Sequence, residues 1–337
     1  MPIEEIINLR RTMPAYDEEL WSFMGRVSGR NLENVSNASL QERLDKIDRN
    51  IQYLDNGNTQ RDSLHADTGW LSPWWWLRAR HWTMLEFHRR GASPAPTPGI
   101  RPMPALAPGF DGVMAGGRKL LVRLDEERWL LNLLNGRVRF APAASYRDTG
   151  LDAARADEEM SKAYRRPGQA IRITGPDGGM IDPIGDVVFA SRRSVERNGE
   201  LHDIPYWFCS FSSDLDPRLF EEFTGSEACI VIFEPMKFVE RALPHLNRAA
   251  PHTVKSLFQN EYFDPHFPGG HKPKAMVSKE MTFAYQREMR FALDPEGGPP
   301  LADGALFVEI GSIKDIAAVY AATGAKIAGT GPDSFLV

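Results

Sequence analysis

The chain has 337 residues, of which 42% are hydrophobic and 25% charged, and this composition excludes a disordered chain and a coiled coil. With 40 Lys and Arg residues against 45 Asp and Glu residues the formal net charge is -5, so binding to nucleic acid or to an anionic membrane needs a local basic patch. The two cysteines, Cys209 and Cys229, are too few for a disulfide framework, and no apolar stretch is long enough to span a membrane. We therefore expect a cytoplasmic protein of about two domains with no membrane span.

A first helix is predicted near residue 40. Ser39 and Glu42 have the spacing of a capping box, and Asn56 followed by Gly57 is a typical stop. Between these signals an apolar residue recurs at alternating steps of four and three, which is the period of one helix face. The apolar residues are Leu40, Leu44, Ile47, Ile51 and Leu54.

A second helix, rich in tryptophan and arginine, is predicted from Pro73 to Gly91, with Ser72 as its N-cap. Its residues 74–76 are three consecutive tryptophans, which occupy successive steps of about 100° and cannot all face one core. Packing against the rest of the protein, or stacking on nucleic-acid bases beside the arginines, would cover the remaining rings. Residues 1–90 are thus predicted to form a small helical domain that is available to bind a partner.

Six prolines fall between residues 91 and 112, where they remove backbone donors and favour an extended chain. We interpret residues 91–112 as a Pro-rich linker. The pattern then changes to short apolar runs separated by turn signals. This change predicts an α+β domain over residues 113–337, built on a mixed, mainly antiparallel sheet.

Turn signals divide this second domain into predicted elements. Asn198 and Gly199 both accept a positive φ, and they predict a hairpin that joins a strand at 186–190 to one at 204–212. The continuous apolar run 228–233 predicts a central strand. The other predicted strands are 119–124, 137–141, 279–292 and 305–310, and the predicted helices are 125–135, 216–225 and 312–323.

Residues 281–292 alternate apolar and polar side chains, and a strand sends alternate side chains to opposite faces. Gln286, Glu288 and Arg290 then stand in a row on one face, at steps of about 7 Å. An amide, a carboxylate and a guanidinium in a row suit polar chemistry. The same alternation is typical of the solvated face of a half-buried sheet, so both interpretations are open here.

Two further candidate positions lie on predicted strands. Ser210 and Ser212 point to the same side at the end of an aromatic strand, and they either orient neighbouring groups or simply close the strand. Arg123 stands in an otherwise apolar strand, where its charge needs a carboxylate partner or an anionic ligand. Arg137 and Arg139 alternate with apolar residues and are predicted to lie on a solvated face.

Taken in order, a strand arginine, a Ser-x-Ser strand end and a Gln-x-Glu strand resemble the signature of the ADP-ribosyltransferase superfamily. The resemblance implies that NAD is the substrate and is cleaved at the nicotinamide–ribose bond, and that a protein, a nucleic acid or water receives the ADP-ribose. It implies that Arg123 orients the dinucleotide and that Ser210 and Ser212 support the nicotinamide pocket. It also implies that Glu288 contacts the nicotinamide ribose and that Gln286 orients the acceptor.

Residues 118–330 are also similar to an uncharacterised bacterial family linked to abortive infection, a form of anti-phage defence. The motifs are Asn135-Gly136, Arg137 to Phe140, Tyr146-Arg147-Asp148, Phe208 to Ser212, and Tyr285 to Arg290. The similarity implies a toxin or an anti-phage effector. From these motifs Tyr146 and Arg290 join Arg123 as the residues expected to contact NAD.

Two other functions are open. The protein is a non-enzymatic binding or sensor protein of a bacterial defence system, in which residues 1–90 recognise a partner, or it is a metal-dependent nuclease. Glu288 and Asp148 are the carboxylate candidates for the nuclease.

No bound metal is expected. Asp264, His266 and His271 occur close together, but their spacing matches none of the usual zinc patterns. The acidic run 157–159 is predicted to be solvated.

Overall fold

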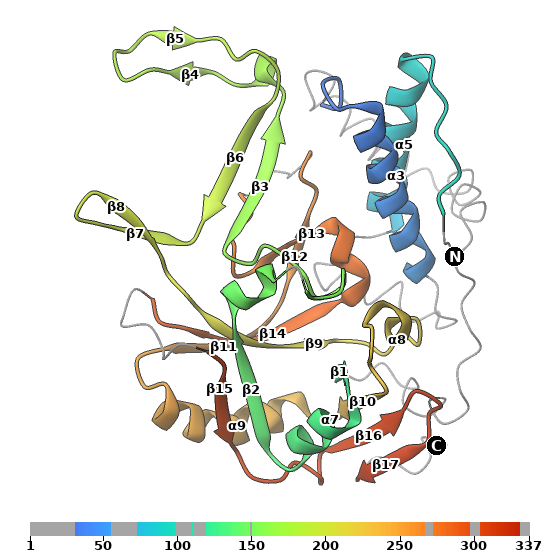
Figure 1. Ribbon diagram of the computed structural model, residues 1–337, viewed down its shortest axis with the longest axis vertical. Helices are drawn as coiled ribbons and strands as arrows, with labels where there is room; N and C mark the ends of the chain where they lie inside the picture. The colour runs from blue at the N-terminus through green and yellow to red at the C-terminus, as the bar shows by residue number, and fades with distance from the viewer. Residues whose placement is uncertain are drawn as a thin grey trace.

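The computed structural model describes residues 31–54, 73–98, 110, 119–148, 150–266, 272–296 and 304–330 (Figure 1). The body of the protein is a large sheet, and its described strands are β1 (Leu121–Asp125), β2 (Arg137–Pro142), β9 (Trp207–Ser212), β10 (Ala228–Ile232), β11 (Val254–Gln259), β14 (Glu288–Asp294), β15 (Leu306–Glu309), β16 (Ala317–Ala321) and β17 (Lys326–Gly329). Seven of them lie side by side in the order β11-β14-β9-β1-β10-β16-β17, while β2 pairs with β9 and with β15. All these pairings are antiparallel.

A parallel pair, β12 (Glu261–Phe263) with β13 (Ser278–Glu280), lies outside this sheet. The predicted α+β class with a mixed, mainly antiparallel arrangement is therefore confirmed. The predicted strands at 119–124, 137–141, 228–233 and 305–310 correspond to β1, β2, β10 and β15.

Helices α7 (Glu127–Leu134) and α9 (Pro235–Ala249) cover one face of the sheet and build the main apolar core with it. The other face of β10 packs against the short helix α8 (Leu219–Glu222) and the buried Phe110. The predicted helix at 125–135 corresponds to α7, and the chain turns after it at Gly136, which has a φ of 101°. A Cβ atom at Gly136 would lie 2.0 Å from the carbonyl oxygen of Gly311, so only glycine fits this turn into β2.

The sheet opens between two of its central strands. β1 and β9 share a single pair in register, Val122 with Ser212, although β1 continues to Asp125 and β9 begins at Trp207. On their outer sides β1 is paired with β10 and β9 with β14 along their lengths. The stretches of β1 and β9 that do not pair with each other leave room for side chains between them.

An arm of short hairpins separates β2 from β9 in the chain, and Figure 1 shows it extending away from the sheet. Its pairs are β3 (Ser161–Arg166) with β6 (Val187–Arg192), β4 (Ile173–Thr174) with β5 (Met180–Ile181), and β7 (Ser194–Arg197) with β8 (Glu200–Asp203). The turn at Asn198 and Gly199 is confirmed, with φ of 54° and 81°, but it joins β7 to β8. The predicted partners were wrong because β9 is buried on both faces and belongs to the central sheet, whereas β6 is half-exposed and pairs with β3.

Two predicted elements in the last third of the chain are wrong. The predicted helix at 312–323 contains β16 instead, because residues 317–320 are buried on both faces between β10 and β17. The predicted strand at 279–292 is interrupted by η5 (Met281–Gln286), a 3-10 helix, and by Arg287 in the left-handed region with a φ of 48°. Tertiary contacts override the strand-like alternation here, since the Arg287 side chain is held by Asp214 and by the carbonyl oxygen of Tyr53.

The N-terminal part of the described chain forms α3 (Asn37–Ile51), the 3-10 turn η1 (Gln52–Leu54) and α5 (Pro73–Arg89). The N-cap of α3 is Ser36, whose Oγ accepts from the backbone N–H of Ser39, so the helix starts earlier than the predicted capping box. Its predicted apolar stripe is confirmed, because Leu40, Leu44, Ile47 and Ile51 are buried. The predicted Asn56-Gly57 stop and the Ser72 cap lie outside the described residues. Helix α5 begins at Pro73, and its Trp76 and Trp82 are buried.

Helix α3 is joined to the sheet body by polar contacts. Arg43 donates to both oxygens of Asp264 at 2.7 and 2.5 Å, and both side chains are buried. Asn50 donates to the carbonyl oxygen of Thr282 and accepts from the backbone N–H of Tyr285, which fixes η5 against α3. None of the helices in the described ranges has the length and apolar character needed to cross a membrane.

The carboxylate of Asp264 is thus used in an ion pair with Arg43, and His271 lies outside the described residues. No group of three His, Cys, Asp or Glu residues within the described ranges is placed to hold a metal ion.

His266 gives the protein an expected sensitivity to acid. Burial, and then the charge of Arg43, lower the pKa of His266 to about 4, against the opposing effect of Asp264. A histidine whose pKa is lower in the folded state stabilises the protein above its unfolded pKa of about 6.5, and that stability is lost as the pH falls toward 4. We expect the free energy of unfolding of the parent to fall by about 3 kcal/mol more than that of His266→Gln between pH 7 and pH 4. Urea unfolding of both proteins measures this difference, and parallel pH profiles would show that His266 is not the sensitive group.

Candidate functional site

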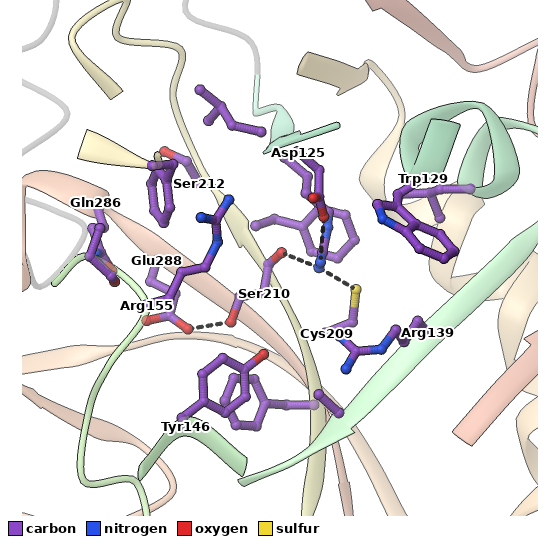
Figure 2. Close-up of a pocket in the computed structure, with 18 of the residues that line it drawn as sticks. Asp125, Trp129, Arg139, Tyr146, Arg155, Cys209, Ser210, Ser212, Gln286 and Glu288 are labelled. Atoms are coloured by element: carbon purple, nitrogen blue, oxygen red, sulfur yellow. Dashed lines mark hydrogen bonds and ion pairs between the residues drawn. The ribbon is translucent and has the colours of Figure 1, made fainter. Parts of the chain in front are cut away.

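The candidate site is a pocket of about 560 Å³ at the opening between β1 and β9. It collects side chains from β1, β2, β9, η5, β14 and the 3-10 turn η3 (Ala143–Arg147). The predicted site residues that line it are Arg123, Tyr146, Ser210, Ser212, Gln286 and Glu288. Figure 2 shows Gln286 and Glu288 on one side of the pocket, Trp129 and Arg139 on the other, and Ser210 between them.

Glu288 lies at the inner end of the pocket and is only 4% exposed. Its Oε1 accepts from the hydroxyl of Ser210 and from Nε of Arg290 at 2.8 Å, and its Oε2 accepts from Nζ of Lys279 at 2.8 Å and Nδ2 of Asn260 at 3.0 Å. Burial alone would raise the pKa of Glu288, but Arg290 and Lys279 outweigh burial and hold it well below its usual range. The carboxylate is therefore ionised at neutral pH and held in one orientation.

Arg290 has no exposed surface and lies behind Glu288 rather than in the pocket. It donates to Glu288 and, at 2.5 Å, to Glu159, and its guanidinium lies over the ring of Phe208 at 4.5 Å. Arg290 was expected to contact NAD, but it does not line the pocket and its guanidinium is buried against two carboxylates. The residue positions Glu288 instead, and the interpretation of this strand face as solvated is wrong for both side chains.

Arg290 and Glu288 belong to a buried cluster of charges whose signs balance. Lys162 donates to Asp157 at 2.9 Å and lies 3.7 Å from Glu159. Burial raises the pKa of Glu159, and Arg290 and Lys162 oppose that rise. The cluster joins three carboxylates, Asp157, Glu159 and Glu288, to three cations, Lys162, Lys279 and Arg290. The prediction that the run 157–159 is solvated is thus wrong for Glu159, which is 1% exposed.

The two serines of β9 have different roles. The hydroxyl of Ser210 donates to Glu288, which makes it an orienting group at the centre of the pocket. The hydroxyl of Ser212 donates to the carbonyl oxygen of Asp214 at 2.6 Å and accepts from its backbone N–H. Ser212 therefore closes the strand, although its side chain also borders the pocket.

Arg123 reaches across the opening from β1 to β9. Its guanidinium donates to the carbonyl oxygen of Ser210 at 3.3 Å, contacts the Sγ of Cys209 at 3.4 Å and pairs with Asp125 at 3.2 Å. The predicted carboxylate partner is thus Asp125, two residues along the same strand. The side chain is still 23% exposed, so one part of the guanidinium faces the pocket.

Tyr146 forms the floor of the pocket between the two ends. Its ring stacks on Phe208 with the ring centroids 4.8 Å apart and an angle of 18° between the planes. Burial raises the pKa of Tyr146 to about 12, against the opposing charge of Arg123. Its hydroxyl is directed toward Ser210 in Figure 2 and makes no hydrogen bond to any residue that the structure describes. The hydroxyl is therefore available to a ligand.

Gln286 is held at both ends of its amide. Its Nε2 donates to the carbonyl oxygen of Ala154 at 2.7 Å, and its Oε1 accepts from Lys279 at 2.9 Å. Lys279 lines the pocket as well and was missed by the sequence interpretation. The sequence signal for Lys279 is that it shares one face of the predicted strand with the apolar residues at 281, 283 and 285. A charged side chain on such a face needs a buried partner.

The mouth of the pocket is aromatic and basic. Trp129 on α7 is 44% exposed and Phe307 on β15 is 43% exposed, and both line the pocket. Arg137 and Arg139 stand beside them on the exposed face of β2, as predicted. Arg137 lies over the ring of Phe307 at 4.6 Å, whereas Arg139 makes no ion pair or hydrogen bond within the described part of the chain.

Comparison of the chain with family models, with characterised proteins and with solved structures finds no match.

Proposed function

We propose that the protein is an ADP-ribosyltransferase-like enzyme that cleaves NAD at the nicotinamide–ribose bond. The observation that supports this proposal most directly is that Arg123, Ser210 and Glu288 meet at one pocket. The three come from β1, β9 and β14, which are neighbours in the sheet. The resemblance in motif order therefore coincides with proximity in space.

In the proposed reaction the bond between ribose C1′ and the nicotinamide nitrogen breaks, and its electron pair stays on the nitrogen. The pyridinium becomes neutral nicotinamide, and the remaining ribose has oxocarbenium character. Water or an acceptor group then adds at C1′ and loses a proton. A buried carboxylate that is already ionised and fixed stabilises such a cation. Glu288 meets these requirements, because its pKa is held low and four donors fix its position.

Ser210 gives the substrate access to this carboxylate. Among the donors that contact Glu288, the serine hydroxyl carries no charge and rotates freely about its C–O bond, whereas Lys279 and Arg290 are held by buried ion pairs. We propose that a ribose hydroxyl replaces Ser210 on Oε1 and that Tyr146 covers the nicotinamide ribose from the floor of the pocket. As part of the same proposal, the ADP-ribose passes to water or to a protein or nucleic-acid acceptor, and the enzyme acts as a toxin or an anti-phage effector.

The test is nicotinamide release from NAD by the purified chain, followed by chromatography. We expect release that continues in the presence of EDTA, because the carboxylate mechanism uses no cation. Activity lost in EDTA and restored by magnesium would favour metal-dependent chemistry instead. NAD binding without any nicotinamide release would favour the binding or sensor protein. If the protein neither binds NAD nor releases nicotinamide, the proposal has no support.

A further inference from the structure

We propose that the mouth of the pocket is a binding subsite for the adenosine diphosphate half of the dinucleotide, with Arg139 on the diphosphate and Trp129 and Phe307 against the adenine. The inference rests on the proposed function, because that function places the scissile bond at Glu288 and so directs the other half of the substrate outward. Arg139 is a binding residue that the resemblance does not assign.

The two ends of the pocket differ in burial and in chemistry. The inner end holds Glu288, Gln286 and Lys279, each 5% exposed or less. The mouth holds the two half-exposed rings of Trp129 and Phe307. Figure 2 places Trp129 and Arg139 across the pocket from Glu288 and Gln286. A ligand that spans the pocket therefore places one part in the buried polar inner end and another part against the half-exposed rings of the mouth.

Arg139 is the arginine of the mouth that remains available for an anion. Arg137 lies over the ring of Phe307 and 3.6 Å from Glu309, Arg123 pairs with Asp125, and Arg155 pairs with Asp152. Arg139, by contrast, has no such partner in the described ranges. Its charge nevertheless acts within the site, since it opposes the rise in the pKa of both Tyr146 and Cys209. A guanidinium in this setting binds phosphate oxygens in a bidentate manner.

The exposed rings suit a purine base. A guanidinium already lies over each of them, Arg128 over Trp129 at 4.9 Å and Arg137 over Phe307 at 4.6 Å. A ring face that accepts a planar guanidinium also accepts a planar base by stacking. Phe307 is paired in register with Arg139 across β15 and β2, so the aromatic and the basic side chains leave the sheet side by side.

The test uses ADP itself as the probe, measured by isothermal titration calorimetry with the full chain. We expect ADP to bind the parent, and Arg139→Gln and Trp129→Ala each to weaken binding about tenfold or more, which corresponds to the loss of one charge-assisted hydrogen bond or one stacked base. Both residues are exposed, so the variants keep the parent fold, which circular dichroism checks. Arg248→Gln is the matched control, because it removes one exposed arginine from α9, outside the pocket. It should bind ADP as the parent does.

The outcomes separate this inference from the proposed function. Absence of ADP binding to the parent, or equal binding by Arg139→Gln and the parent, overturns the subsite even where the protein releases nicotinamide. ADP binding that depends on Arg139, without nicotinamide release, retains the subsite as the site of a nucleotide-binding protein and removes the proposed enzyme.

Discussion

Glu288→Gln is expected to lower the rate of nicotinamide release by at least roughly a hundredfold, because the amide no longer stabilises the positive charge that develops on the ribose. The substitution also leaves the charge of Arg290 and Lys279 in excess within a buried cluster. A solvated glutamate would cost little, but removal of one partner from a buried ion pair costs about 3 kcal/mol or more. We therefore expect a lower melting temperature as well as a lower rate, and the assay must be run where the variant is folded.

Asp264→Asn is a suitable control for this loss of stability. Asp264 is also a buried carboxylate, 2% exposed, and it is paired with Arg43, but it lies outside the pocket. Its conversion to the amide should cost a similar amount of free energy and leave nicotinamide release unchanged. If both variants lose activity in proportion to their stability, Glu288 is a structural residue and takes no part in the chemistry.

The central strands of the sheet were predictable where burial decides the structure. The apolar run 228–233 and the arginine-bearing strand 119–124 each gave the correct element, because a continuous buried run has few alternatives. The alternation in 281–287 gave a wrong element. There the side chains of Asn50, Arg287 and Asp214 determine the backbone, and their partners are distant in sequence.

The identity of the candidate site residues was predictable from the sequence, but their burial and their ion-pair partners were not. Ser210 and Glu288 were identified from motif order, yet nothing local indicated that Glu288 is buried, that Lys279 pairs with it, or that Glu159 pairs with its neighbour Arg290. Those partners come from β13 and from the segment before β3, and only the folded sheet brings them together. For the same reason Arg290 was assigned to a ligand although it contacts two carboxylates.

Arg290→Met is expected to cost about 3 to 5 kcal/mol of unfolding free energy, because it leaves Glu288 and Glu159 with one cation too few. Glu159→Gln alone should also destabilise the protein, since it leaves one cation too many. The double variant restores the balance of charge in the cluster. We expect its cost to be smaller than the sum of the two single costs by about 2 to 3 kcal/mol, as measured by urea unfolding.

The pair Arg241 and Asp315 provides a comparison for this cycle, because it is a bidentate arginine–carboxylate pair, at 2.7 and 2.8 Å, that lies on the surface. Asp315 is 62% exposed, so water compensates for the loss of either partner, and the coupling in Arg241→Met and Asp315→Asn should stay below about 1 kcal/mol. A large coupling in the buried cycle and a small one at the surface would mean that charge balance, rather than hydrogen-bond geometry, holds Glu288 in place. Additive costs at Arg290 and Glu159 would mean that the two residues stabilise the sheet independently. In that case the low pKa of Glu288 would depend on Lys279 and on its direct contact with Arg290, without help from the rest of the cluster.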